Sequence, residues 1–219
     1  MGGHPPPVLY YMLDKQNELE YNITHMKKIN KNLIKSIEKR LKIHHELYSQ
    51  PVKAEQWEEI LVQSIRENGN TASWDPGSHK IGEDISTDIF GRISCKSGSL
   101  SIKKKGPEVI NISGSRTTKH KTLEDKINHL SKSHDDYYFC LAKYKKDINS
   151  GEYRYYLITF SSTLIKPSNL KWKKHGKNYL AEGDGIKQTI QTSMSGQLWT
   201  TFDTSMASSR IELNAGRKN

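Results

Sequence analysis

The spacing of apolar residues predicts helical structure at the start of the chain. Residues 13–49 contain no glycine or proline. Apolar side chains recur there every three or four residues, at Leu19, Ile23, Met26, Ile29, Leu33, Ile37 and Leu41. The pattern predicts one long helix, or two helices with a break near residues 30–32. The other face is rich in lysine, which is typical of a solvated face or of a surface for phosphates or a partner subunit.

A second amphipathic helix is predicted after Pro51, in the segment "AEQWEEILVQSIRENG". Its apolar face carries Trp57, Leu61 and Ile65, and Gly69 is a suitable residue to end it. The loop "NTASWDPGSH", with a Pro-Gly turn, follows.

The remaining pattern predicts strands and one further helix. Thr122 is a suitable N-cap for a helix over about 122–133, and the tail "LKWKKHGKNYLAEG" is expected to form a basic loop and a short strand. Strands are expected at about 81–87, 91–97, 99–104, 107–113, 137–144 and 153–162, with another in "QLWTTFDTS". This order predicts a mixed α/β fold, with a central mixed sheet flanked by helices, over residues 51–219, and a helical extension over residues 1–50.

The net charge of the chain gives the strongest indication of a binding partner. The formal net charge is +10 and the pI is near 9.4, which favours a polyanionic partner, most often nucleic acid. A basic globular protein without such a partner is the alternative. No apolar run approaches a membrane span, so no membrane partner is expected. Cys95 and Cys140 lie in apolar strand-like runs and are expected to be free thiols in a reducing compartment.

Candidate chemistry lies in the segment "GEDISTDIFGRISCKSG", residues 82–98. Because side chains alternate along a strand, Ile93 and Cys95 are expected to face the core, with Ser94 and Lys96 on the other face. Asp84 on the preceding strand can share that second face. The pair Asp84 and Lys96 is then either a salt bridge of a hairpin or part of a metal site. Two rival carboxylates, Asp75 and Asp88, fall in a turn and near the hairpin tip.

A third candidate, Glu58, lies at the edge of the buried face of the second helix. Two carboxylates can hold Mg²⁺ with waters completing its shell. The metal then stabilises charge on a scissile phosphate and lowers the pKa of a water molecule, while a lysine positions that water and offsets charge in the transition state.

These motifs resemble those of the PD-(D/E)xK nuclease superfamily. The stretch "GEDI…RISCKSG" is similar to its aspartate at the start of one strand and its xK on the next. "WEEILVQSIRENG" resembles the preceding helix, where a glutamate faces the site; the match favours Glu58 over Glu55 or Glu59. "GSHKIGEDIS…RISCKSG…INISGSRTTKHKTLEDKINHL" looks more narrowly like type II restriction endonucleases. The resemblance covers roughly residues 55–133.

The resemblance implies a set of site residues. Glu58, Asp84, Ser94 and Lys96 would be catalytic. Mg²⁺, or Mn²⁺ in its place, would be held by Asp84, Glu58 and the main-chain carbonyl of Cys95. The position before xK is usually Asp or Glu in the family, and here it is Ser94; the family tolerates this when the helix glutamate moves into the site.

Contacts to DNA are expected from polar and basic segments on both sides of these motifs. Hydroxyls and main-chain N–H groups suit phosphate oxygens, and arginine can bind guanine with two hydrogen bonds. A solvated turn or a hydrogen-bonded loop is the alternative for each segment. The expected DNA-binding residues are His79, Lys80, Lys103, Ser113, Ser115, Arg116, Thr117, Lys119, Lys173 and Lys174.

The function that follows is a Mg²⁺-dependent type II restriction endonuclease that cuts double-stranded DNA at a short palindrome. Cutting both strands implies a homodimer, with residues 1–50 as a dimerisation element or DNA clasp and residues 51–219 as the catalytic domain. A nucleoid-associated location in a prokaryotic cytoplasm is implied. The alternatives are a junction or repair nuclease of the same fold and a non-catalytic DNA-binding protein.

Overall fold

The computed structural model describes residues 29–74, 84–102, 106–132, 137–145, 152–194 and 196–217. Several sequence predictions fall outside these ranges. They are the helical pattern before residue 29, the rival carboxylate Asp75, and the predicted DNA contacts His79, Lys80 and Lys103.

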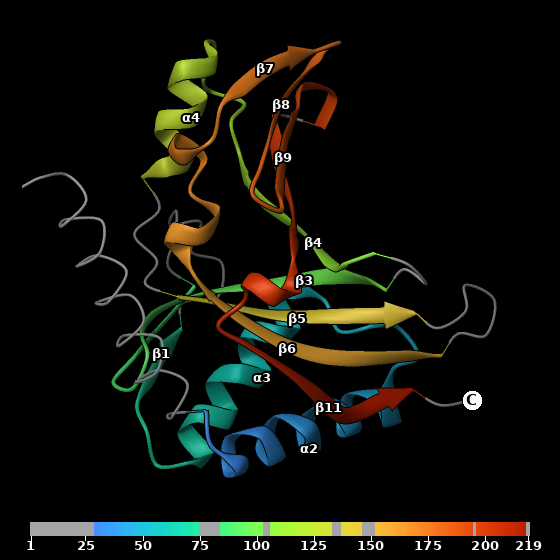
Figure 1. Cartoon of the computed structure of the whole chain (residues 1–219). Helices are drawn as coiled ribbons and strands as arrows, with labels where there is room; N and C mark the ends of the chain where they lie inside the picture. The colour runs from blue at the N-terminus through green and yellow to red at the C-terminus, as the bar shows by residue number, and fades with distance from the viewer. Residues whose placement is uncertain are drawn as a thin grey trace, which may run out of the picture.

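The described residues form a mixed α/β structure, as predicted (Figure 1). Its helices are α2 (Lys31–Leu47), α3 (Ala54–Glu67) and α4 (Leu123–Ser131). Among these helices none is both long and apolar enough to cross a membrane. The strands are β1 (Ala72–Trp74), β2 (Ile85–Thr87), β3 (Gly91–Ile102), β4 (Glu108–Arg116), β5 (Tyr137–Lys145), β6 (Tyr153–Ser161), β7 (Trp172–His175), β8 (Asn178–Gly183), β9 (Ile186–Gln191), β10 (Gln197–Asp203) and β11 (Ser209–Arg217).

All of these strands belong to one sheet with the order β11-β6-β5-β3-β4-β10-β9-β8-β7, and β2 joins β3 and β1 beside this path. The pairing of β3 with β5 is parallel, whereas the other described pairings are antiparallel. The sheet is therefore mixed, and β3 lies at its centre.

The prediction of two strands at 91–97 and 99–104 is wrong, because one continuous strand, β3, runs from Gly91 to Ile102. The backbone stays extended through Gly98, which pairs with Ile112 of β4 and with Ala142 of β5. A Cβ atom at Gly98 would lie 2.9 Å from Ile112 Cγ2 and 3.1 Å from Cys140 Sγ. The glycine is needed for close packing between neighbouring strands, not for a turn.

Helix α2 begins at Lys31, within the region where a helix break was one alternative. Asn30 caps it, because its side-chain oxygen accepts hydrogen bonds from the main-chain nitrogens of Asn32 at 3.0 Å and Leu33 at 2.9 Å. Of the predicted segment 13–49, the described part is thus a separate, capped helix.

Helices α2 and α3 cover one face of the lower sheet, formed by β3, β5, β6 and β11 (Figure 1). Ile37 of α2 is fully buried, in one cluster with Trp57 of α3 and Phe139 of β5. The indole of Trp57 also donates to the Phe139 carbonyl at 3.0 Å. Residues 31–47 of the predicted extension therefore pack into the same core as the strands.

The second half of β4 leaves the lower sheet and runs into a smaller part of the molecule (Figure 1). We call this part the upper lobe and define it as residues 113–132, 166–191 and 196–200. It has its own small core of Leu130, Ile190 and Leu198. The segment expected to form a basic loop and a short strand forms the β7–β8 hairpin: the short strand is β8, and the basic part is a second strand, β7, that pairs with it from Trp172 with Ala181 onward.

Helix α4 starts as the sequence predicts. The Thr122 hydroxyl accepts a hydrogen bond from the main-chain nitrogen of Asp125 at 3.1 Å, which satisfies one of the free N–H groups of the first turn. The helix ends at Ser131, two residues before the predicted limit. It packs on the strands of the upper lobe through Leu130.

Substitution of Gly98 by alanine should destabilise the protein by about 1–3 kcal/mol, because the added methyl group overpacks the contact with Ile112 and Cys140. Denaturant unfolding of both variants measures the effect. Gly183→Ala is the control, since a Cβ atom there meets nothing within 4 Å. Equal unfolding free energies for the two variants would contradict the close packing at Gly98.

Candidate active site

Asp84 lies immediately before β2, at the open end of the hairpin that β2 forms with β3. The main-chain nitrogen of Asp84 donates to the Ile93 carbonyl at 3.1 Å, so the pairing of the two strands begins one residue before β2. The side chain of Asp84 then bonds to the next main-chain donor along this edge of β3: its Oδ2 accepts a hydrogen bond from the main-chain nitrogen of Cys95 at 2.7 Å. The carboxylate is thereby fixed to the backbone of β3.

Two side chains of β3 donate to the same oxygen of Asp84. The Ser94 hydroxyl lies 3.1 Å and the Lys96 ammonium 3.3 Å from Oδ2. The structure thus brings together Asp84, Ser94 and Lys96, three of the residues predicted from the hairpin. In the part of the chain that the structure describes, no hydrogen bond to the other oxygen, Oδ1, is found, which leaves Oδ1 open to a cation.

Lys96 also contacts an aromatic ring that the sequence did not indicate. Its Nζ lies 5.7 Å from the ring centroid of Tyr138, within the range of a cation–π interaction. Tyr138 stacks in turn on Phe160, with centroids 5.0 Å apart and ring planes 6° from parallel. Tyr138 comes to this place through the parallel pairing of β3 with β5, which joins segments about forty residues apart.

Glu58 approaches the same site from α3. Its Oε2 accepts a hydrogen bond from the indole nitrogen of Trp74 at 3.1 Å. The pKa of Glu58 is raised above its ordinary value, chiefly by burial and also by the negative charge of Asp84. The Trp74 hydrogen bond and the positive charge of Lys96 act in the opposite direction. The two carboxylates therefore lie within electrostatic reach of each other, and only Lys96 supplies a positive charge among the causes of this shift. Such a pair favours an added cation.

Cys95 contributes its main-chain groups to the site, and its thiol takes no part. Burial raises the pKa of its thiol well above the ordinary value, and the charges of Asp84 and Glu58 raise it further. The thiol therefore stays protonated. In an extended strand the N–H and the C=O of one residue lie along the same edge. Because the Cys95 N–H points to Asp84, we expect its carbonyl oxygen on that edge as well.

Ser94 has a supporting place in the site. Its side chain is 1% exposed and its hydroxyl donates to Asp84. A hydroxyl in this position orients the carboxylate. Ser94 thus places a hydrogen-bond donor, and not a second carboxylate, beside Asp84.

The donor set can be compared with what Mg²⁺ requires. In proteins this ion is commonly held by one or two carboxylates, with waters and substrate phosphates in the remaining positions. Asp84 Oδ1, the Glu58 carboxylate and the Cys95 carbonyl fit that description. Within the described ranges, no group of three or more His, Cys, Asp or Glu side chains is close enough to hold a metal by side chains alone.

The predicted DNA contacts that the structure describes lie mainly in the upper lobe. Ser113, Ser115 and Arg116 are at the end of β4, and Arg116 is exposed. Lys119 is exposed in the turn before α4, and Lys173 and Lys174 are exposed on β7.

Thr117 differs from the other predicted contacts. It is fully buried, and its hydroxyl and its main-chain nitrogen both donate to the Gly196 carbonyl, at 2.8 Å and 3.1 Å. Its side chain holds the turn after β4 against β10 and does not face the solvent. The polar pattern around it did not distinguish this structural threonine from the exposed residues on either side.

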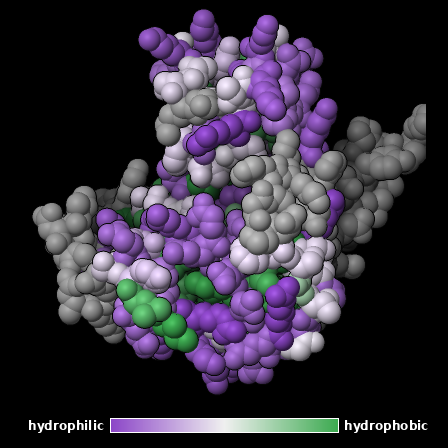
Figure 2. All heavy atoms as spheres, turned by 180° about the vertical axis from the view of Figure 1, so that it is seen from behind, coloured by the Kyte–Doolittle hydropathy of each residue, from purple (hydrophilic) through white to green (hydrophobic). Residues whose placement is uncertain are grey.

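Among the residues that the structure describes, the excess of positive charge is concentrated in the upper lobe. Its defined residues include eleven lysines and arginines against four acids, whereas the rest of the described chain has fourteen against twelve. Figure 2 shows many hydrophilic residues among the coloured residues of this lobe on the face it displays. A lobe with such an excess attracts a polyanion, and β3 and β4 connect it directly to Asp84 and Lys96.

Comparison with protein-family models, with curated proteins and with solved structures found no match for this chain.

Removal of the Asp84 carboxylate should weaken the fold at this point. Asp84→Ala leaves the Cys95 N–H and the buried Ser94 hydroxyl without their acceptor, with an expected loss of about 1–3 kcal/mol in unfolding free energy. Asp84→Asn keeps an acceptor oxygen and should lose less. Denaturant unfolding without divalent metal measures both.

Asp88→Ala is the matched control, because Asp88 is an exposed carboxylate in the turn of the same hairpin. It should change the unfolding free energy by less than about 0.5 kcal/mol. If Asp84→Ala were no less stable than Asp88→Ala, the carboxylate would not hold β2 to β3.

Proposed function

We propose that this protein is a Mg²⁺-dependent endonuclease that hydrolyses phosphodiester bonds in double-stranded DNA, of the type II restriction kind. One observation carries the proposal: Asp84 and Lys96 meet at 3.3 Å at the end of a hairpin, with Glu58 close enough to shift in pKa because of both. This arrangement agrees with the resemblance to the PD-(D/E)xK nucleases, and a strongly basic lobe adjoins it.

The roles of the residues follow from their contacts. Asp84 offers Oδ1 to a cation while Oδ2 remains held by β3. Lys96, fixed between Asp84 and the Tyr138 ring, places a positive charge beside the scissile phosphate and positions the attacking water. Glu58 supplies the second carboxylate from α3. A bound Mg²⁺ would supply charge stabilisation at the phosphate and a lower pKa for that water.

The basic upper lobe supplies the binding energy for DNA in this proposal. Contacts between lysine or arginine and phosphates release counterions and do not depend on sequence. Arg116, exposed at the end of β4, is suited to a guanine edge or a phosphate. Two strands of a palindrome are cut most simply by two copies related by a two-fold axis, so the proposal includes a homodimer.

A second candidate is a DNA-binding protein without nuclease activity. The presence of Ser94 at the usual carboxylate position favours it, as does the ion pair of Asp84 with Lys96, since a hairpin can use such a pair for structure alone. The two candidates share the basic lobe and differ in what Asp84 and Lys96 do in the presence of Mg²⁺.

Digestion of a plasmid of known sequence with Mg²⁺ tests the proposal. Wild type should give discrete fragments, and Lys96→Ala and Asp84→Asn should each lower the cleavage rate at least about 100-fold. Lys96→Ala removes the positive charge beside the reacting phosphate, and Asp84→Asn weakens the binding of the cation. Binding of the same DNA, measured without metal by fluorescence anisotropy, should change far less. Asp88→Asn should cleave as wild type does.

Other outcomes of the plasmid digestion would point to a different function. A continuous smear, or cleavage confined to branched substrates, would replace the restriction enzyme by a structure-specific nuclease. Tight DNA binding without cleavage in Mg²⁺ or Mn²⁺ would overturn the nuclease proposal and leave Asp84 and Lys96 as a structural ion pair.

A further inference from the structure

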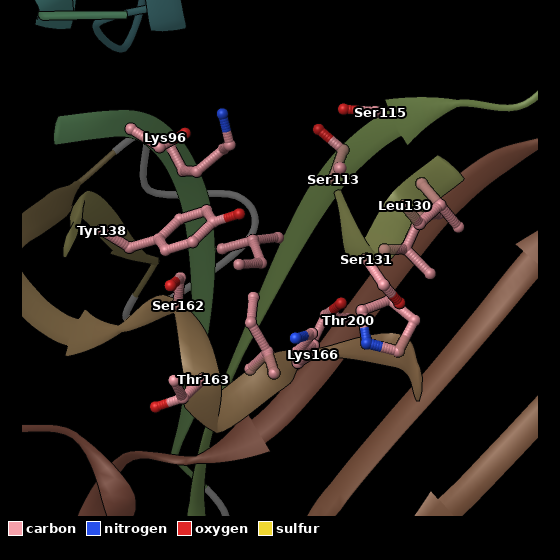
Figure 3. A pocket seen from close by; sticks show the side chains of 16 residues that line it. Lys96, Ser113, Ser115, Leu130, Ser131, Tyr138, Ser162, Thr163, Lys166 and Thr200 are labelled. Carbon is pink, nitrogen blue, oxygen red and sulfur yellow. The ribbon is translucent and has the colours of Figure 1, made fainter. Parts of the chain in front are cut away.

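A cavity of about 120 Å³ lies between the lower sheet and the upper lobe, directly beside Lys96. Figure 3 shows Lys96 and Tyr138 on one side of it and Ser113 and Ser115 on β4 across from them. The short helix η1 (Ser162–Ile165) and Lys166 form its floor. None of this was evident from the sequence, because the lining comes from segments that lie far apart in the chain.

The lining of the cavity is basic and rich in hydroxyls. Lys96 and Lys166 are its charged residues, and none of the sixteen lining residues is acidic. Seven hydroxyl side chains of serine and threonine line it: Ser94, Ser113, Ser115, Ser131, Ser162, Thr163 and Thr200. Two ammonium groups and many O–H groups, with no carboxylate among the described lining residues, suit an anion with several oxygen atoms. Of the two ammonium groups, that of Lys96 is also paired with Asp84 behind it.

Several of these hydroxyls have their hydrogen left to donate. Ser131 Oγ accepts from the Ser168 nitrogen at 3.0 Å, and Thr200 Oγ1 accepts from Gln188 Nε2 at 3.2 Å. Among the described residues, neither hydroxyl donates to another acceptor, and the Ser113 hydroxyl has no hydrogen-bond partner. The cavity therefore presents donors without matching acceptors.

Within the upper lobe, hydrogen bonds hold the segment that carries Lys166 to β7 and α4. The indole nitrogen of Trp172 donates to the Pro167 carbonyl at 2.9 Å, and the bond from Ser168 to Ser131 fixes the same segment to α4. Lys166 itself remains exposed toward the solvent side of the cavity. Its charge is thus held near the cavity by a rigid backbone.

The size of the cavity limits its occupant. Sites for free cofactors and other small molecules usually measure about 300–1,000 Å³, well above the volume found here. A single phosphate group of a longer chain needs less room. We propose that this cavity binds one phosphodiester group of the DNA strand, adjacent to the phosphate that faces Asp84, with Lys166, Ser113, Ser131 and Thr200 as donors. The identity of the polyanion rests on the proposed function; the anion site rests on the lining.

Salt dependence of DNA binding, measured by fluorescence anisotropy with a labelled duplex in EDTA, tests this site without cleavage. Each phosphate contact contributes about −0.9 to the slope of log K against log[salt]. Lys166→Ala should therefore make the slope shallower by about one and weaken binding roughly 5–10-fold at 0.1 M salt. Ser113→Ala should weaken binding without changing the slope. Lys53→Ala, which changes an exposed lysine at the start of α3, should match wild type.

Equal slopes and affinities for Lys166→Ala and Lys53→Ala would overturn the phosphate site, as would the absence of DNA binding by wild type. The phosphate site and the nuclease activity can be tested independently of each other. If Lys166→Ala shows the shallower slope while wild type does not cleave in Mg²⁺, the phosphate site stands and the enzymatic function does not.

Discussion

The carboxylate of Asp84 is the group on which the arrangement of this site depends. Its Oδ2 accepts from one main-chain nitrogen and two side chains of β3, at 2.7–3.3 Å. The main-chain bond fixes the end of β2, and the side-chain bonds fix the direction of Ser94 and Lys96. Because all three donors meet at one oxygen, the other oxygen keeps the capacity to bind a cation.

Strand β3 connects Asp84 and its partners to the rest of the molecule. Its first half carries Ser94 and Lys96, and from Gly98 onward it pairs with β4, which continues into the basic upper lobe. The same strand packs through Ile93 and Cys95 against the core that contains α3, and α3 carries Glu58. One strand therefore links the two carboxylates, the lysine and the surface that we propose binds DNA.

Local pattern was sufficient for the hairpin and the helices. Alternation along 91–97 correctly separated Ile93 and Cys95 from Ser94 and Lys96, because the side-chain period of a strand is fixed by its geometry. Amphipathic spacing located α3, and capping chemistry located the start of α4 at Thr122. These features depend on residues close together in the chain.

Features that depend on distant segments were missed. The parallel pairing of β3 with β5 brings Tyr138 to Lys96, and no local signal specifies that partner. The cavity with Lys166 requires several distant segments to meet. Thr117 looked like an exposed polar residue, but its contact with Gly196 lies across 79 positions of sequence. The role of a polar residue is set by such partners as much as by its own chemistry.

We propose that Asp84 and its neighbours hold a divalent cation. Anomalous diffraction from crystals soaked in Mn²⁺ tests this. We expect a peak at coordination distance, about 2.1 Å, from Asp84 Oδ1 and the Cys95 carbonyl oxygen, with Glu58 turned toward it. Crystals that show no Mn²⁺ at Asp84, with Lys96 still paired to the carboxylate, would contradict it.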